Sequence, residues 1–175
     1  KSRRDMRDVT TITIDPVDAR DFDDALSLKV INDNNFEIGV HIADVSHYVI
    51  PDTKLDEEAY ERATSVYLVD RCVPMLPERL SNGICSLKPN EDRLAFSVVF
   101  NMDSNGRILK EWHGKTVIHS DKRFAYEDAQ EIIEGNDTSY TGEDRVYPLM
   151  VNQLNQLAQK IRKKRIKDGS IEMGG

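Results

Sequence analysis

Five aspartates lie within ten residues near the start of the chain, in the segment TITIDPVDARDFDDA at residues 11–25. They are Asp15, Asp18, Asp21, Asp23 and Asp24. Crowded carboxylates repel one another, and a pair about 4 Å apart costs roughly 4 kcal/mol at an effective dielectric constant near 20. A divalent cation would offset this repulsion, and oxygen ligands of this kind favour Mg²⁺ or Mn²⁺ over Zn²⁺.

Several carboxylates around one or two Mg²⁺ ions would form a site suited to phosphoryl transfer. The ions would generate a hydroxide, orient a phosphodiester and stabilise the leaving oxygen. In an extended segment Asp21 and Asp23 would point to one side and Asp24 to the other. A calcium loop fits less well, because the segment has no central glycine and no Glu that closes a twelve-residue frame. From these residues alone, a metal site and a solvated acidic loop both stay open.

Predicted strands flank the acidic segment on both sides. The run at residues 10–14 ends at Pro16, because proline removes a hydrogen-bond donor from the ladder. Apolar residues then alternate on both sides of two turn-rich segments, which predicts two β-hairpins. The strands of these hairpins are expected at residues 26–30, 36–42, 94–102 and 107–120.

Predicted helices occupy residues 52–67, 78–87, 126–134 and 148–167, and the last of them has a clear apolar stripe. Thr53 followed by Asp56 resembles a helix start. Because strands dominate the first two thirds and helices the last, we expect an α+β fold with a mixed or mostly antiparallel sheet and flanking helices. Residues 1–9 are expected to be a linker or a truncated start, and residues 10–175 the folded part.

The composition indicates one globular domain, with 175 residues, 39% hydrophobic and 31% charged. A net charge of −7 argues against nucleic-acid binding, although an acidic metal site would account for part of it and cations gather at residues 1–7 and 160–167. The sequence shows no membrane span or signal peptide, and Cys72 and Cys85 are expected to be reduced. We therefore expect a cytoplasmic protein with no membrane partner.

Four strings in order along the chain resemble the catalytic RNB domain of the ribonuclease II family. They are TIDPVDARDFDDALSL, GVHIADVSHYV, RATSVYL and VPMLPERLSNGICSLKPNEDRLAFSV. Through HIADVSHYV the likeness is greatest to the bacterial ribonuclease R branch, and it extends from about residue 10 into AYEDAQ. It implies a metal-dependent exoribonuclease that degrades RNA processively from the 3′ end to nucleoside 5′-monophosphates.

The resemblance also implies roles for single aspartates. The four site aspartates of the family match Asp15, Asp21, Asp23 and Asp24, which would hold Mg²⁺, or Mn²⁺ in its place, together with the scissile phosphate. Asp23 is implied to lie nearest the chemistry, Asp15 and Asp24 to be the main metal ligands, and Asp21 to support them. No role in the family matches Asp18.

Further candidates concern RNA contacts. Tyr67 matches an aromatic residue that stacks on a base near the single-stranded 3′ end of RNA, an interaction worth roughly 1–3 kcal/mol; a core tyrosine is the alternative. Lys88 and Arg93 are candidate phosphate contacts or part of a solvated loop. The cations at 160–167 could bind RNA, but such a run is more often the solvated face of a helix. Metal binding by His41 or His47 is the weaker interpretation, because carboxylates already fill that role.

The family's domain continues beyond the matched region. The resemblance implies a second half with an arginine-rich segment like SPIRRYADL, and flanking cold-shock and S1 modules, none of which is present in these 175 residues. We therefore expect a partial RNB domain that carries the metal site, is inactive or nearly so alone, and has an apolar face where the second half would pack. The alternatives are a non-catalytic RNA-binding or scaffold module of the same fold and a calcium-binding domain.

Overall fold

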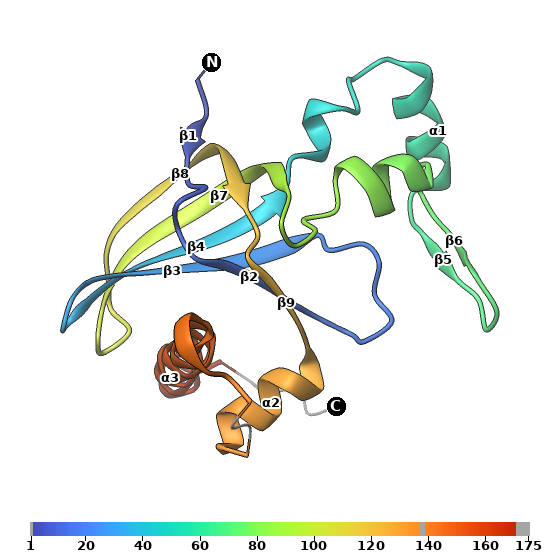
Figure 1. The fold of residues 1–175 in the computed structure, drawn as a ribbon. Helices are drawn as coiled ribbons and strands as arrows, with labels where there is room; N and C mark the ends of the chain where they lie inside the picture. The colour runs from blue at the N-terminus through green and yellow to red at the C-terminus, as the bar shows by residue number, and fades with distance from the viewer. Residues whose placement is uncertain (1, 137–138, 171–175) are drawn as a thin grey trace.

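A curved mixed β-sheet forms the body of the protein, and two helices pack on one of its faces (Figure 1). The computed structural model describes residues 2–136 and 139–170, and within them the sheet has seven strands in the order β1-β8-β7-β4-β3-β2-β9. Strand β1 is parallel to β8 and β9 is parallel to β2, whereas the other pairs are antiparallel. The predicted α+β fold with a mixed sheet is therefore confirmed. The strands of the sheet are β1 (Arg4–Asp5), β2 (Thr11–Asp15), β3 (Asp24–Asn32), β4 (Asn35–Ala43), β7 (Asp92–Asp103), β8 (Ile108–His119) and β9 (Lys122–Ala125).

Both predicted hairpins are confirmed. Strands β3 and β4 pair from Asp24 opposite Ile42 onwards, and β7 and β8 pair over nearly their whole length. Gly106 closes the second hairpin with a φ of +80°, a left-handed conformation that glycine adopts at little cost. Strand β9 was not predicted, because its four residues carry no alternation of their own and pair with a strand far away in sequence.

The first helix, α1 (Lys54–Arg62), begins as predicted, because the Thr53 side chain accepts a hydrogen bond from the Asp56 N–H. The prediction of helix as far as residue 67 is wrong. Ala63 adopts a left-handed conformation with a φ of 59°, which ends the helix. The chain then forms a separate hairpin of β5 (Val66–Tyr67) and β6 (Cys72–Val73).

The later helices lie close to their predicted positions. Helices α2 (Tyr126–Glu134) and α3 (Val146–Lys167) match two predictions, and a π-helical turn, η2 (Leu80–Ile84), lies within a third. Two short 3₁₀ segments, η1 (Val45–His47) and η3 (Gly142–Arg145), complete the described elements. Residues 137–138, in the segment between α2 and η3, lie outside the described residues. None of the described helices is both long and apolar enough to cross a membrane.

The N-terminal residues differ from the expected linker. Arg4 and Asp5 form β1 on the edge of the sheet, and the Met6 side chain is buried in the core. The Arg3 guanidinium lies 2.6 Å from the buried carboxylate of Asp44. Backbone pairing, burial and an ion pair therefore make this segment part of the fold.

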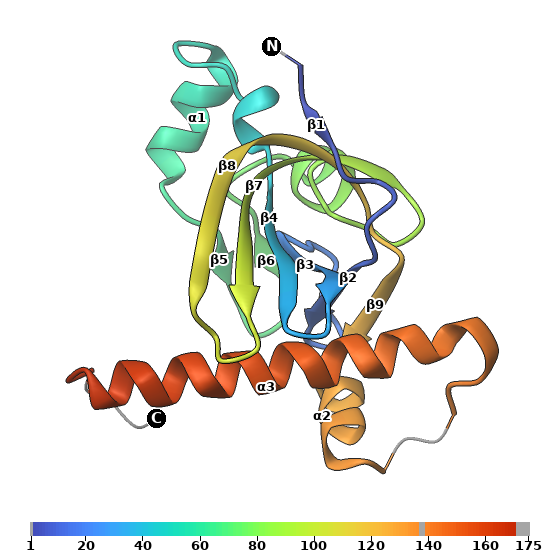
Figure 2. The same ribbon diagram turned by 90° about the vertical axis from the view of Figure 1, so that its left-hand side faces the viewer.

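Helices α2 and α3 cover one face of the sheet, which we call the helical face (Figure 2). Ile12, Phe36 and Leu157 are buried there. The cover is incomplete, because an apolar groove of about 550 Å³ remains between the sheet and α3. Ile42 and Phe96 are 49% and 44% exposed on the same face. Apolar side chains therefore stay exposed on the helical face, and the packing of a second half of the domain there stays a prediction.

The opposite, inner face of the sheet holds a buried polar network centred on His41. Its Nδ1 lies 2.7 Å from Ser97 Oγ and its Nε2 lies 2.9 Å from Ser27 Oγ, so both ring nitrogens have partners. Gly39 makes room for the ring, since a Cβ at that position would lie 2.6 Å from His41 Nε2. A metal-binding role for His41 is excluded by this arrangement.

We expect His41 to make the protein less stable in weak acid. Burial, and to a smaller extent the charge of Arg4, lower its pKa from 6.5 to about 4. Below pH 6.5 the His41 ring therefore becomes protonated in the unfolded chain while it stays neutral in the folded protein. The stability associated with the neutral ring is complete above pH 6.5 and is lost as the pH falls towards 4, by about 3 kcal/mol in total. Urea unfolding at pH 7 and at pH 4.5 measures this loss.

A His41→Gln variant provides the decisive comparison. Glutamine cannot take up the proton, so the variant should lose less stability than the wild type between the two pH values, whatever its stability at pH 7. His47 is exposed, and His47→Gln should therefore leave the pH dependence as it is in the wild type. An identical pH dependence in His41→Gln and the wild type would contradict the assignment.

Candidate active site

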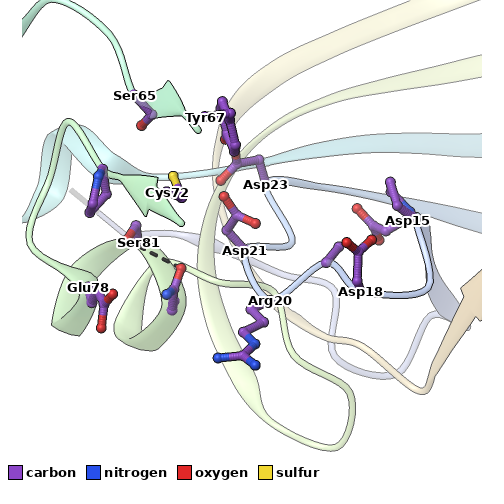
Figure 3. Close-up of a pocket in the computed structure, with 14 residues that line it drawn as sticks. Asp15, Asp18, Arg20, Asp21, Asp23, Ser65, Tyr67, Cys72, Glu78 and Ser81 are labelled. Carbon is purple, nitrogen blue, oxygen red and sulfur yellow. Dashed lines mark hydrogen bonds between the residues drawn. The ribbon is translucent and has the colours of Figure 1, made fainter. Parts of the chain in front are cut away.

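The acidic segment forms a loop over one end of the sheet and lines a cavity of about 540 Å³ (Figure 3). The β5–β6 hairpin and the residues before and within η2 supply the other walls. Figure 3 shows Asp21 and Asp23 beneath Tyr67, Asp15 and Asp18 together further along, and Arg20 turned away. We call this space the acidic cavity; its carboxylates come from Asp15, Asp18, Asp21, Asp23 and Glu78.

Phe22 anchors the loop to the inner core. Its side chain is 6% exposed and packs in the cluster that contains Leu87 and Ile118. Phe22 points into the core while its neighbours Asp21 and Asp23 line the cavity, which is the alternation expected of an extended backbone. One apolar residue in the middle of the acidic segment thereby sets the direction of two carboxylates.

Ser86 ties the same loop to the segment after η2. Its hydroxyl accepts a hydrogen bond from the Phe22 N–H at 3.0 Å and donates one to the Arg20 carbonyl at 3.1 Å. The Leu87 N–H donates to the Phe22 carbonyl at 2.8 Å. These bonds hold the backbone on both sides of Asp21 and are out of reach of water, because Ser86 is fully buried.

Arg123 holds the other end of the loop. Its guanidinium donates to the carbonyls of Pro16 and Val17, at 2.8 and 2.7 Å, and lies 5.2 Å from the centre of the Phe22 ring. The contact with the ring is a cation–π interaction. Neither Ser86 nor Arg123 was predicted to act at this site, because both are distant in sequence and have ordinary neighbours.

Burial, together with the charges of neighbouring aspartates, raises the pKa values of two carboxylates of the loop. Burial, followed by the charge of Asp24, raises the pKa of Asp15. Partial desolvation in the cavity, followed by the charges of Asp21 and Asp24, raises the pKa of Asp23. The negative form of these groups is therefore disfavoured until a positive charge joins them.

A hard divalent cation suits this donor set chemically. Asp15 is 8% exposed, and no described group donates a hydrogen bond to its buried Oδ2 atom. Such an oxygen is costly to leave without a partner, and a cation would supply one. However, no three Asp, Glu, His or Cys side chains among the described residues are arranged to hold a metal ion together. Coordination would therefore require the aspartate side chains to turn towards a common point.

The structure separates the predicted residues into two groups. Asp15, Asp21, Asp23 and Tyr67 line the acidic cavity, whereas Asp24 does not. Asp24 begins β3 opposite Ile42 and acts on Asp15 and Asp23 only through its charge. Asp18 lines the cavity although no role was predicted for it.

Tyr67 projects from the β5–β6 hairpin and is 73% exposed, so the alternative of a core tyrosine is wrong. The nearby charge of Asp21 is the main cause that raises its pKa. A second cavity of about 510 Å³ adjoins the first and shares Asp21, Asp23 and Tyr67 with it. An exposed aromatic ring beside two carboxylates offers a flat surface on which a planar ligand could stack.

The two candidate phosphate contacts lie elsewhere. Arg93 donates to the Ser86 carbonyl at 2.9 Å and pairs with the carboxylate of Glu91. Its guanidinium therefore binds the protein itself, and it supports the segment that holds the acidic loop. Lys88 is partly buried and does not line the acidic cavity.

Comparisons with known proteins identify the family. The model of the RNB domain family matches residues 3–174. The chain is 46% identical to DIS3-like exonuclease 2 of Schizosaccharomyces pombe over 99% of its length, and 46% identical to ribonuclease R of Thermotoga maritima over 97%. It covers only 20% and 24% of those two proteins. A relative from Arabidopsis thaliana that is 41% identical over 98% of the chain is described as an inactive exonuclease.

A solved structure agrees with this result. RNase R of Mycoplasma genitalium in complex with ribose-methylated single-stranded RNA matches with a TM-score of 0.89 and 33% identity. The match covers 99% of this chain and 27% of that chain. The agreement of sequence and fold extends over the whole described structure, and this chain belongs to the RNB domain family.

Proposed function

We propose that this chain supplies the acidic part of the active site in a processive, metal-dependent 3′-to-5′ exoribonuclease that releases nucleoside 5′-monophosphates. The observation that carries the proposal is the acidic cavity, in which three of the four family aspartates and Tyr67 face the same space. The chain spans about a fifth to a quarter of the curated relatives described above. The activity is therefore proposed for a protein of the relatives' length that contains this sequence, and the chain alone is proposed to be inactive or nearly so.

The residues of the chain have distinct roles in this proposal. Asp15, Asp21 and Asp23, joined by Asp24, would hold the divalent cation, Mg²⁺ or Mn²⁺. When bound, it supplies Lewis-acid polarisation of the phosphate and a more acidic water molecule. Tyr67 stacks on a base near the 3′ end of a single strand, which places the last phosphodiester towards the carboxylates and tolerates any base.

A second function is favoured by two observations. No described group of side chains is arranged for metal, and an inactive exonuclease is among the relatives of similar identity. The chain would then be part of a non-catalytic RNA-binding or scaffold module with the same fold. The presence of all four family aspartates favours the enzyme.

A chimeric enzyme separates the two functions. The matching segment of ribonuclease R from Thermotoga maritima is replaced by this chain, and a labelled single-stranded RNA is incubated with Mg²⁺ or with EDTA. The proposal predicts stepwise degradation from the 3′ end that requires Mg²⁺. A chimera that folds and binds RNA but leaves it intact would support the non-catalytic module. Robust degradation by the chain alone would contradict the proposed need for the rest of the domain.

A further inference from the structure

The C-terminal turns of α3 carry a concentrated positive charge. Residues three or four positions apart share one face of a helix. Lys167 lies four residues after Lys163 and three after Lys164, and all three lysines are exposed. We call these three lysines the basic end of α3. The whole helix contains no Asp or Glu in its 22 residues, although the chain has 31 acidic residues in total.

The absence of acidic residues on this helix is informative. Acidic and basic side chains four residues apart on a helix stabilise one another, and α3 contains no such pair. Here Lys163 and Lys167 are four residues apart and repel. Neither they nor Lys164 form an ion pair with another described residue. The repulsion would be relieved by an external polyanion.

The basic cluster near the N-terminus differs from the basic end of α3, because its arginines form ion pairs within the protein. Near the N-terminus, Arg3 pairs with Asp44 at 2.6 Å and Arg4 pairs with Glu37 at 3.0 Å. Arg7 likewise lies 2.7 Å from its neighbour Asp5. The N-terminal arginines are thus paired with carboxylates of the protein, whereas the basic end of α3 has no ion-pair partner among the described residues.

The basic end lies far from the acidic cavity. The start of β3 pairs with the end of β4, which pairs with Ala95 near the start of β7. The last turns of α3 lie at the other end of β7, where Lys160 Nζ donates to the Ser104 carbonyl at 2.6 Å. At about 3.3 Å per residue, the separation along β7 is roughly 30 Å. Figure 2 shows α3 extending beyond the β7–β8 turn.

We propose that the basic end of α3 binds the phosphate backbone of RNA, as a second contact remote from the acidic cavity. This inference rests on the proposed function, which makes RNA the available polyanion. A membrane surface fits less well, because surface helices need a broad apolar face beside their cations, and in these last turns only Ile166 is an exposed large hydrophobic residue. A remote backbone contact has no base preference and holds a long strand while its end is processed.

The test compares two matched triple variants of this chain. One is Lys163→Gln, Lys164→Gln and Lys167→Gln; the control is Lys29→Gln, Lys54→Gln and Lys110→Gln, three lysines that are also exposed but lie on other elements. Circular dichroism verifies that both variants fold. Fluorescence anisotropy then measures the dissociation constant for labelled RNA in EDTA, where metal-dependent cleavage cannot interfere, at several salt concentrations.

The expected result is a specific loss of electrostatic binding. Three lost phosphate contacts lower the slope of log K against log salt by about 2 and weaken binding roughly 10- to 100-fold near 0.1 M salt. At about 3.4 Å per stacked nucleotide, the 30 Å separation corresponds to roughly nine nucleotides. The loss should therefore be large for a strand well above that length and small for one well below it.

Four outcomes would overturn the inference. Equal losses in the two triple variants, or no loss in the first, would show that the basic end is only a solvated helix face, and would leave the proposed exoribonuclease intact. Binding of the wild type to phosphatidylserine vesicles but not to RNA would assign the surface to membranes. Failure of the wild type to bind RNA of any length would count against the proposed function as well.

Discussion

Asparagine in place of Asp23 is expected to lower the rate of RNA hydrolysis by the chimeric enzyme about 10²- to 10⁴-fold. Asp23 lines the acidic cavity beside Tyr67 and has a raised pKa from partial desolvation and from the charges of Asp21 and Asp24. Asparagine keeps the shape of the side chain but removes the charge that a cation and a reacting water would need. Single-turnover hydrolysis of a labelled oligoribonucleotide in Mg²⁺ measures the loss.

Asp18→Asn is the matched control for this variant. Asp18 is in the same loop and lines the same cavity. It does not match any of the site aspartates of the family. The control should therefore hydrolyse RNA within a few-fold of the parent chimera, and RNA binding in EDTA should be similar for both variants. If the two substitutions reduce hydrolysis equally, the loop acts through its total charge and the special role of Asp23 is wrong.

The largest effect on stability is expected for Phe22→Ala, with a loss of about 3–5 kcal/mol in the free energy of unfolding. The phenyl ring is almost completely buried between the inner core and the Arg123 guanidinium. Removal of the ring leaves an empty space in the core. It also removes the contact that keeps Asp21 and Asp23 facing the acidic cavity. Urea denaturation at pH 7, followed by circular dichroism, measures the loss.

Val17→Ala is the control for Phe22→Ala. It tests whether the loss in the free energy of unfolding comes from the burial of the Phe22 ring or would follow from any substitution in this loop. Val17 lies in the same loop with 69% of its side chain exposed, so the variant should stay within about 0.5 kcal/mol of the wild type. A loss below 1 kcal/mol for Phe22→Ala would mean that the loop does not depend on this ring.

The four strands of the two long hairpins were predictable because local alternation determines them, whereas β1, β5, β6 and β9 were not. The two hairpins and helices α2 and α3 follow from patterns within a few residues. The inner face of β7 was harder to predict, because its buried residues are small or polar: Ala95 and Ser97 have no exposed surface. The buried hydroxyl group of Ser97 has a hydrogen-bond partner in His41 of the neighbouring strand β4, which lies beside it. No pattern within β7 itself contains that information.

The acidic site was predictable in its residue types and not in its geometry. The crowding of aspartates and the family strings indicated Asp15, Asp21 and Asp23, which do face one cavity. The outward position of Asp24 follows from the start of β3, and the exposure of Tyr67 follows from the early end of α1 at Ala63. Alanine gives no sequence signal for a left-handed residue. Ser86 and Arg123 hold the loop through contacts between distant segments, which a single sequence does not reveal.

The contact of Arg123 with the carbonyl of Val17 joins residues 106 positions apart, and it has a consequence for biosynthesis. A chain that emerges from the ribosome exposes β2 as an unpaired edge until β9 has been translated, and contacts so distant in sequence form late. Unpaired edges are points at which nascent chains aggregate. The acidic loop is therefore completed only when the last described strand of the sheet has left the ribosome, so chaperones that shield nascent strands should favour its correct assembly.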